Sequence, residues 1–243
     1  MGVRRDGELL REPTQALVAA AVVFAAFATI VALVAVDPER PPLLQSLDDS
    51  WRDLALRAPG WAERASELLR TLGSGIVMVP LRIGVAVWLL ARRRRTDAAA
   101  WLIAWALADA VTTVLKLVIG RSHPDGSDGA TSFPSAHAKT AAQVALGLVL
   151  IATSPRRGRL LWWTIAFSWI AVMAASRTVV DEHWLSDVLA GSLLGAACAI
   201  GSGAILQGLH PAGVGSPHSP TSGYEGVRTN DQKRDTGSNP RRV

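Results

Sequence analysis

Six long apolar runs, separated by short polar loops, constrain this chain more than any other feature of its sequence. The first run, residues 14–36, is uncharged and rich in alanine and valine. About 20 apolar residues in helical form cross the hydrocarbon core of a bilayer, where every backbone polar group needs a partner within the protein. The sequence therefore predicts an all-α, polytopic membrane protein. The other five runs lie at about residues 71–91, 98–119, 137–153, 160–175 and 184–206.

The first run also has to be compared with a signal peptide, because it lies near the N-terminus. The apolar core of a signal peptide has about 7–15 residues and is followed by a cleavage site with small residues. The run at residues 14–36 is longer, and no clean site of that kind ends it. We therefore expect a retained first helix.

Residues 37–70 are mixed in polarity and interrupt the series of spans. Three prolines open the segment, and leucine, tryptophan and alanine recur at helical spacing between residues 43 and 55. This pattern is typical of an amphipathic helix on a membrane surface. The expected architecture is a six-transmembrane-helix bundle, residues 14–207, with one interfacial amphipathic helix. Residues 1–13 are expected to form a cytoplasmic N-terminus, and residues 208–243, which are poor in large apolar residues, a disordered cytoplasmic tail.

Charge and cysteine content exclude some classes and orient the spans. The 25 lysines and arginines exceed the 20 acids, but they form short clusters beside apolar runs, so nucleic-acid binding is not expected. Basic loops mark the cytoplasmic side, which puts Arg92–Arg95, residues 156–159 and both termini inside. The loop at residues 37–70 is less decisive, since five arginines share it with seven acids. The single cysteine, Cys198, excludes a disulfide framework and a cysteine-rich metal site.

Three polar clusters lie at the ends of these runs, all on the predicted outer side. The first extends from Lys116 to Pro124, the second from Ser132 to His137 and the third from Ser176 to Asp187. Separate spans would thus bring cations, imidazoles and one carboxylate to one place. A phosphoester needs this set: positive donors for its non-bridging oxygens, an in-line nucleophile and an acid for the leaving alkoxide.

The third cluster offers the nucleophile. His183 and Asp187 are four residues apart and lie on one face of a helix that begins near Trp184. The carboxylate would accept a hydrogen bond from one ring nitrogen and leave the other nitrogen to attack phosphorus. Arg177, on the preceding loop, would fold back as a forked oxygen donor. Alone, this pair also fits a surface histidine beside a helix-stabilising acid, and the other two clusters favour the catalytic interpretation.

The second and first clusters offer an anion site. Ser135, Ala136 and His137 follow Pro134 at an expected helix start, where free backbone amides and the helix dipole attract anions. Ser135 would add a hydroxyl, and a protonated His137 would donate to the leaving oxygen. Lys116 ends the third run as a point charge. Taken alone, these residues are better explained by a serine cap, an exposed histidine and a lysine that extends to the headgroups.

Together the clusters resemble the type 2 phosphatidic acid phosphatase superfamily of membrane lipid phosphatases, which is related to the vanadium haloperoxidases. The family pattern is Lys, six residues, Arg-Pro; then Pro-Ser-Gly-His; then Ser-Arg, five residues, His, three residues, Asp. The third element matches fully, and the second has Ala136 in place of glycine. The first keeps Lys116 and Pro124, but His123 occupies the arginine position and Arg121 lies two residues earlier.

The resemblance implies a six-helix bundle and a two-step hydrolysis that uses no metal or other cofactor. It implies that His183 forms a phosphohistidine, that Asp187 orients it and that His137 protonates the leaving group. A charged His123, or Arg121 reaching across, would replace the missing arginine. The other phosphate-binding residues would be Lys116, Ser135, Ala136 and Arg177.

Two ionisable residues, Arg82 and Asp109, lie well inside the second and third runs. Such residues are costly in a membrane unless they are paired or face water. Their depths, counted from the loop Arg92–Arg95, differ by only a few residues. We expect a buried structural pair, in preference to a role in substrate binding. Lys139, one turn after Ser135, is expected either to contact a second phosphate or headgroup or to be exposed.

The leading functional expectation is a lipid phosphate or diphosphate phosphatase at the outer leaflet of the cell membrane. Polyprenyl diphosphate, phosphatidylglycerophosphate and phosphatidic acid are candidate substrates, and the partners would be this lipid and the bilayer. One alternative is a phosphotransferase that passes the group from the same phosphohistidine to another acceptor. Another is a non-catalytic membrane protein or lipid transporter, which would be indifferent to replacement of His183 by alanine. No sequence feature indicates an oligomeric state.

Overall fold

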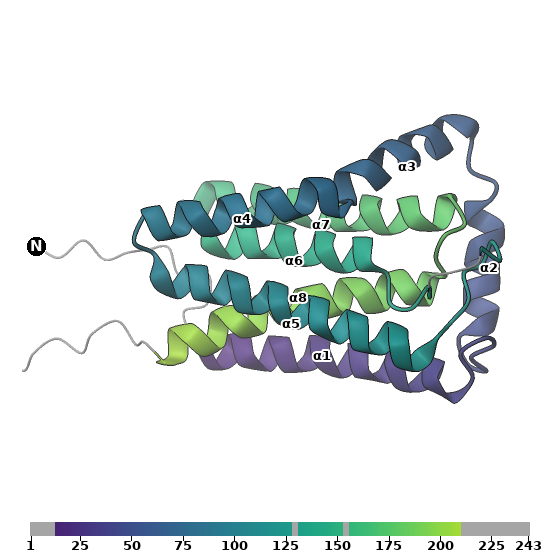
Figure 1. Cartoon of the computed structure of the whole chain (residues 1–243), viewed down its shortest axis with the longest axis horizontal. Helices are drawn as coiled ribbons and strands as arrows, with labels where there is room; N and C mark the ends of the chain where they lie inside the picture. Colours follow the sequence, from purple (N-terminus) through teal and green to yellow (C-terminus); the bar gives the residue numbers. More distant parts are fainter. Residues whose placement is uncertain (1–12, 128–130, 153–155, 210–243) are drawn as a thin grey trace, which may run out of the picture. The chain divides into compact units, whose positions relative to one another are not determined.

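The computed structural model of the chain describes residues 13–127, 131–152 and 156–209, and its regular structure in these ranges is entirely helical (Figure 1). This confirms the predicted all-α class. The expected N-terminal segment and C-terminal tail lie almost wholly outside the described residues. The helices of the described part are α1 (Pro13–Val36), α2 (Gln45–Ala55), α3 (Gly60–Gly73), α4 (Gly75–Ala91), α5 (Arg95–Ile119), α6 (Ala136–Ile151), α7 (Arg156–Val179) and α8 (Leu185–Leu209).

Most of these helices correspond to the predicted membrane runs. α1, α5, α7 and α8 are long and apolar enough to cross a bilayer, and α3 with α4 forms a fifth candidate span that is bent by 45°. The sixth expected span corresponds to α6, which is apolar but has only 16 residues. By length and composition, the described helices therefore support four membrane spans, or five if α3 and α4 form one bent span. α6 is apolar but shorter than these spans.

The second predicted run, residues 71–91, is not one straight helix. α3 begins at Gly60, inside the segment expected to lie on the surface, and Ser74 in an extended conformation separates it from α4. A Cβ atom at Gly73 would lie only 2.8 Å from Cδ2 of His137. The glycine at this break therefore lets the chain pass close to the start of α6.

α8 packs against α1, α5 and α6, and so lies among the other long helices. Its close contact with α6 depends on Gly191 and Gly195, because a Cβ on these glycines would collide with the carbonyl oxygens of Ser135 and Lys139. Small residues of this kind let membrane helices approach closely. As a result, the first turns of α6 and α8 meet, and the Ser135 N–H donates to the Asp187 carbonyl oxygen at 3.1 Å.

α2 lies crosswise over the end of the bundle where α5 and α7 end and α6 and α8 begin (Figure 1). It has the two unlike faces expected of an interfacial helix, since Leu47 and Leu54 are more than half exposed while its inner side is buried. Arg52 of this helix pairs with Asp181, in the loop before α8, at 2.6 Å. α2 is therefore tied to the loop that carries the third polar cluster.

Candidate active site

The proposed nucleophile, His183, lies in the loop between α7 and α8 and is placed by the first turn of α8. The Trp184 backbone N–H donates to Oδ2 of Asp187 at 3.1 Å, as acids in the first turn of a helix commonly accept from the cap residue. The same oxygen lies 3.5 Å from Nδ1 of His183, somewhat longer than an ordinary hydrogen bond. Because Nδ1 faces the carboxylate, Nε2 is the ring nitrogen available to a substrate.

The surroundings of His183 favour its neutral form. Burial lowers the pKa of His183, and the neighbouring Asp187 carboxylate offsets only part of this effect. Lys116 and His123 are close enough for their charges to lower it further. An imidazole with a pKa below its ordinary value of about 6.5 is unprotonated at neutral pH, which is the state that a nucleophile requires.

The second cluster forms the first turn of α6. Ser135 caps the helix, and its Oγ accepts from the Ala138 N–H at 3.5 Å. Ala136 is the first residue of the helix, where backbone N–H groups have no partner within the helix. Nε2 of His137 is buried and has no hydrogen-bond partner in the described part of the chain. His137 is close enough to His183 for the charges of the two rings to interact, so the second and third clusters converge.

Arg177 occupies the last turn of α7, which continues beyond the predicted end at residue 175. Its side chain is fully buried, and Nη1 donates to Oε2 of Glu182 at 3.1 Å. Arg70 of α3 contacts the other oxygen of Glu182 at 3.2 Å. Two guanidinium groups therefore share one carboxylate beside His183.

Residues of the first cluster, Lys116 and His123, also lie near His183. Lys116, in the last turn of α5, donates through Nζ to the Thr131 carbonyl oxygen. The ring centroids of His123 and His183 are 5.3 Å apart. Nδ1 of His123 contacts the Glu182 carbonyl oxygen, and because a carbonyl only accepts, Nδ1 carries the proton and Nε2 is the remaining ring nitrogen.

Arg121, unlike His123, is used in buried ion pairs. It is fully buried, with Nη1 2.8 Å from Oδ1 of Asp187 and Nη2 2.8 Å from Oδ2 of Asp48. Both terminal nitrogens therefore contact carboxylates. Of the two residues considered as replacements for the family arginine, His123 is the one that lies beside His183.

The ionisable residues of the second and third runs lie together, but the expected pair is only half buried: Arg82 is 3% exposed, whereas the side chain of Asp109 is 43% exposed. Nη1 of Arg82 lies 3.4 Å from Oδ2 of Asp109, and Trp105 donates to the same oxygen at 2.7 Å. Lys139 is buried and pairs with Oδ1 of Asp109. Sequence reasoning missed this contact, because it placed Lys139 at a phosphate or in solvent.

Three residues near the site were not identified from the sequence: Asp48, Arg70 and Glu182. For Asp48 a signal was present, since this acid lies on the same helical face of α2 as Leu44 and Trp51. An acid on an otherwise apolar face indicates a buried partner. Arg70 and Glu182 carry no comparable signal in the sequence.

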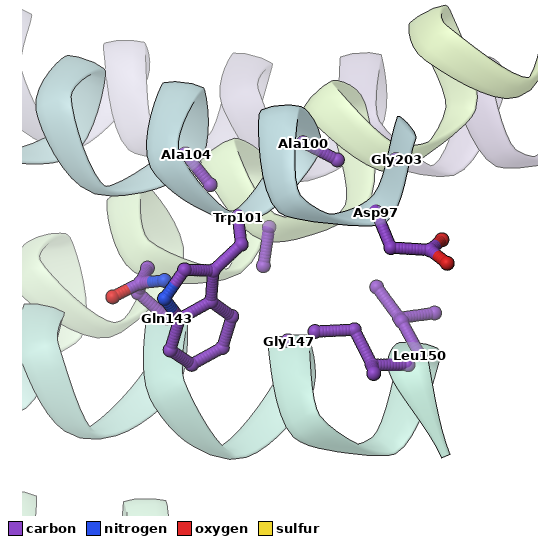
Figure 2. A pocket seen from close by; sticks show the side chains of 10 residues that line it. Asp97, Ala100, Trp101, Ala104, Gln143, Gly147, Leu150 and Gly203 are labelled. Carbon is purple, nitrogen blue, oxygen red and sulfur yellow. The ribbon is translucent and has the colours of Figure 1, made fainter. Parts of the chain in front are cut away.

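A separate pocket lies between α5, α6 and α8 and contains none of the residues of the three clusters. Figure 2 shows the side chains of Trp101 and Gln143 side by side at its wall. Gln143 is fully buried, and its amide atoms have no hydrogen-bond partner among the described residues. This pocket is distinct from the candidate active site.

Comparisons with known proteins bear on this arrangement. Residues 97–209 match the family model described as the PAP2 superfamily. The structure is similar to that of a transmembrane PAP2 type phosphatidylglycerolphosphate phosphatase from Bacillus subtilis, with a TM-score of 0.65 and 22% identity over 78% of this chain and 94% of that one. It is also similar to LpxE of Aquifex aeolicus, with a TM-score of 0.53 and 22% identity over 64% of this chain and 94% of the other. No curated protein matches the chain.

These findings confirm the resemblance that the three motifs indicated. The matched region, residues 97–209, contains the three clusters and the helices that carry them. The solved structures, at 22% identity, share the fold of the bundle. Residues 97–209 are thus similar in sequence to the PAP2 superfamily, and the bundle shares its fold with the two solved phosphatase and LpxE structures.

Proposed function

We propose that this chain is a membrane lipid phosphatase, which hydrolyses a phosphomonoester or diphosphate through a phosphohistidine at the outer face of the cell membrane. The observation that carries the proposal is the surroundings of His183. The buried imidazole of His183 lies beside Asp187. Lys116, His123 and His137 are all close enough to interact with it electrostatically. This is the combination of nucleophile, cations and acid that phosphoryl transfer requires.

The chemistry would proceed in two steps. Nε2 of His183 attacks phosphorus, and the bond from phosphorus to the leaving oxygen breaks while His137 donates a proton to that oxygen. The lipid alcohol leaves, or a lipid monophosphate when the substrate is a diphosphate. Water then attacks phosphorus, the N–P bond breaks, and His137 accepts the proton of the water. The products are the lipid and inorganic phosphate, and neither step requires a metal ion.

The phosphoryl oxygens would be held by Lys116, Arg177, Ser135 and the amide of Ala136. Arg177 already contacts an anionic group, the carboxylate of Glu182, and a substrate oxygen would take over part of that contact. His123 would donate through Nε2 in its charged form, since its Nδ1 proton is used by the Glu182 carbonyl oxygen. Charge-assisted hydrogen bonds of this type are the strong ones in phosphate recognition.

An apolar groove beside the site fits a substrate with a hydrocarbon chain. The groove is lined by residues of α3, α4, α6 and α7. Leu72, one of these residues, precedes Gly73, which lies against His137. A lipid whose leaving oxygen is protonated by His137 would therefore extend into this groove. Polyprenyl diphosphate, phosphatidylglycerophosphate and phosphatidic acid all have such chains.

Phosphate release by the purified protein in detergent tests the proposal. The three lipid phosphates are compared with short-chain esters of the same headgroups, each with and without EDTA. We expect release from at least one lipid, faster than from its short-chain counterpart and unchanged by the chelator. Product analysis with an added acceptor lipid separates hydrolysis from phosphotransfer. Failure to release phosphate from any lipid would contradict the proposal.

Replacing His123 with arginine, the residue of the family pattern, is expected to leave kcat/KM equal or higher. Arginine is always charged and presents a forked set of donors that fits two phosphate oxygens, whereas His123 has one ring nitrogen left for the substrate. The control His123→Gln, which cannot carry a positive charge, should be less active than His123→Arg. A severe loss of turnover in His123→Arg would argue against this role.

A further inference from the structure

The ion-pair network at the start of α8 extends beyond the residues of the family pattern. Asp48 of α2 is 1% exposed, and Arg121 and Asp187 are fully buried. Arg121 bridges the two carboxylates, with both N–O distances at 2.8 Å. Helix α2 is therefore connected through Arg121 to the carboxylate beside His183.

Asp48 also binds the first turn of α8 itself. Its Oδ1 accepts from the Ser186 backbone N–H at 2.8 Å, and its Oδ2 accepts from the Ser186 hydroxyl at 2.7 Å. The hydroxyl oxygen in turn accepts from Nη1 of Arg121 at 2.7 Å. All four oxygens of Asp48 and Asp187 thus face a hydrogen-bond donor or the imidazole of His183.

Burying the charged groups of Asp48, Arg121 and Asp187 costs free energy unless each of them keeps its partners. The three charged groups are removed from water and carry one excess negative charge, which the positive end of the α8 dipole offsets. Removing one partner of a buried ion pair leaves an uncompensated charge behind. For the same reason Arg121 is not free to turn towards a substrate phosphate, because that movement would abandon both Asp48 and Asp187.

We propose that Asp48 is a positioning residue: through Arg121 and Ser186 it holds the Asp187 carboxylate, and hence the His183 imidazole, in the orientation that the reaction needs. The inference rests on the proposed phosphatase function and deepens it. It makes α2, which lies outside the matched family region, part of the support of the active site. Arg121 is assigned to the same support and not to the phosphate.

The test is a comparison of Asp48→Asn with Asp49→Asn in the full-length protein. Asp49 is the neighbouring, exposed acid of α2, where it accepts from Gln45 at 2.7 Å. Misplacing a reacting group by about 1 Å can cost up to about 100-fold in rate. We expect Asp48→Asn to lower kcat about 10- to 100-fold and to change KM less than about threefold, with wild-type kinetics for Asp49→Asn.

The pH profile separates positioning from a general loss of folded protein. The charged and titratable groups around His183 are Asp187 of α8, Lys116 of α5, His123 of the loop after α5 and His137 of α6. Arg177 with Glu182 lies beside it, and the pair of Arg121 and Asp48 acts through Asp187. Asp48→Asn removes a negative charge and leaves the positive charge of Arg121 less neutralised, which disfavours the imidazolium form. The acid limb of kcat/KM should therefore move to lower pH. A smaller folded fraction would lower the rate without moving the limb.

A second variant keeps the test decisive if Asp48→Asn is poorly folded. Ser186→Ala removes only the hydroxyl that links Asp48 and Arg121, and it should lower kcat several-fold with little change in KM. Wild-type kcat in either variant, or a loss confined to KM, would overturn the inference while leaving the phosphatase function intact. Wild-type protein without phosphatase activity would overturn both.

Discussion

Replacement of His183 by alanine is expected to abolish phosphate release almost completely, with kcat lowered by about 10⁴-fold or more, as for other enzymes that lose their nucleophile. The reason is geometric. Nδ1 of His183 faces the Asp187 carboxylate at 3.5 Å, and Nε2 of the same ring is left for the substrate. Without that nitrogen the remaining cations would still bind a phosphate, but no group would be placed to attack it. KM is therefore expected to change far less than kcat.

The measurement is phosphate release under saturating lipid, with His218→Ala as the matched control. His218 belongs to the C-terminal segment outside the described residues, so this variant removes a histidine from a part of the chain without an assigned role. We expect it to retain wild-type activity. A His183→Ala protein with more than about a tenth of wild-type kcat would be inconsistent with a nucleophilic role and would favour a non-catalytic function.

Replacement of His137 by alanine is expected to produce the second-largest loss, about 10²- to 10³-fold in kcat with a lipid substrate. Nε2 of His137 is buried and unpaired among the described residues. The ring lies against Gly73, which follows Leu72 of the apolar groove. Its proton would be needed most when the leaving oxygen is that of a poorly acidic alcohol. With p-nitrophenyl phosphate, whose leaving group needs no proton, the loss in the first-turnover release of nitrophenol, which precedes the water step, should fall below about tenfold.

The comparison of the two substrates is the essential control for His137. A residue that only maintains the structure would slow both reactions by the same factor. Equal losses in the first-turnover rates with the lipid and with p-nitrophenyl phosphate would therefore assign His137 a structural role. The same pair of substrates applied to His183→Ala should give equal, severe losses, because the nucleophile is needed whatever group leaves.

Much of the site could be predicted because spans of alternating direction return the chain to the same side of a membrane. The ends of α5 and α7 and the starts of α6 and α8 must then lie together, and with them Lys116, His137 and His183. This argument uses only the lengths of the apolar runs and the positions of the polar residues at their ends. It does not depend on how each side chain turns.

The direction of individual side chains could not be predicted in this way. Gly120 ends α5 in the left-handed conformation, with φ at 65°, and the chain then turns so that Arg121 lies in the interior against Asp48. Lys139 was misjudged for a similar reason: which neighbour its helical face meets depends on how α6 packs against α5. The bend between α3 and α4 lies where Gly73 passes close to His137, a contact between distant parts of the chain.

The most direct test of the account is to identify the residue that receives the phosphoryl group. Wild-type protein is mixed with ³²P-labelled lipid phosphate, quenched in alkaline denaturant within a single turnover and analysed by peptide mass spectrometry. The account predicts label on His183 that is stable to alkali and lost in acid, with none in His183→Ala. Label on another residue, or single-turnover release of phosphate without any labelled protein, would contradict it.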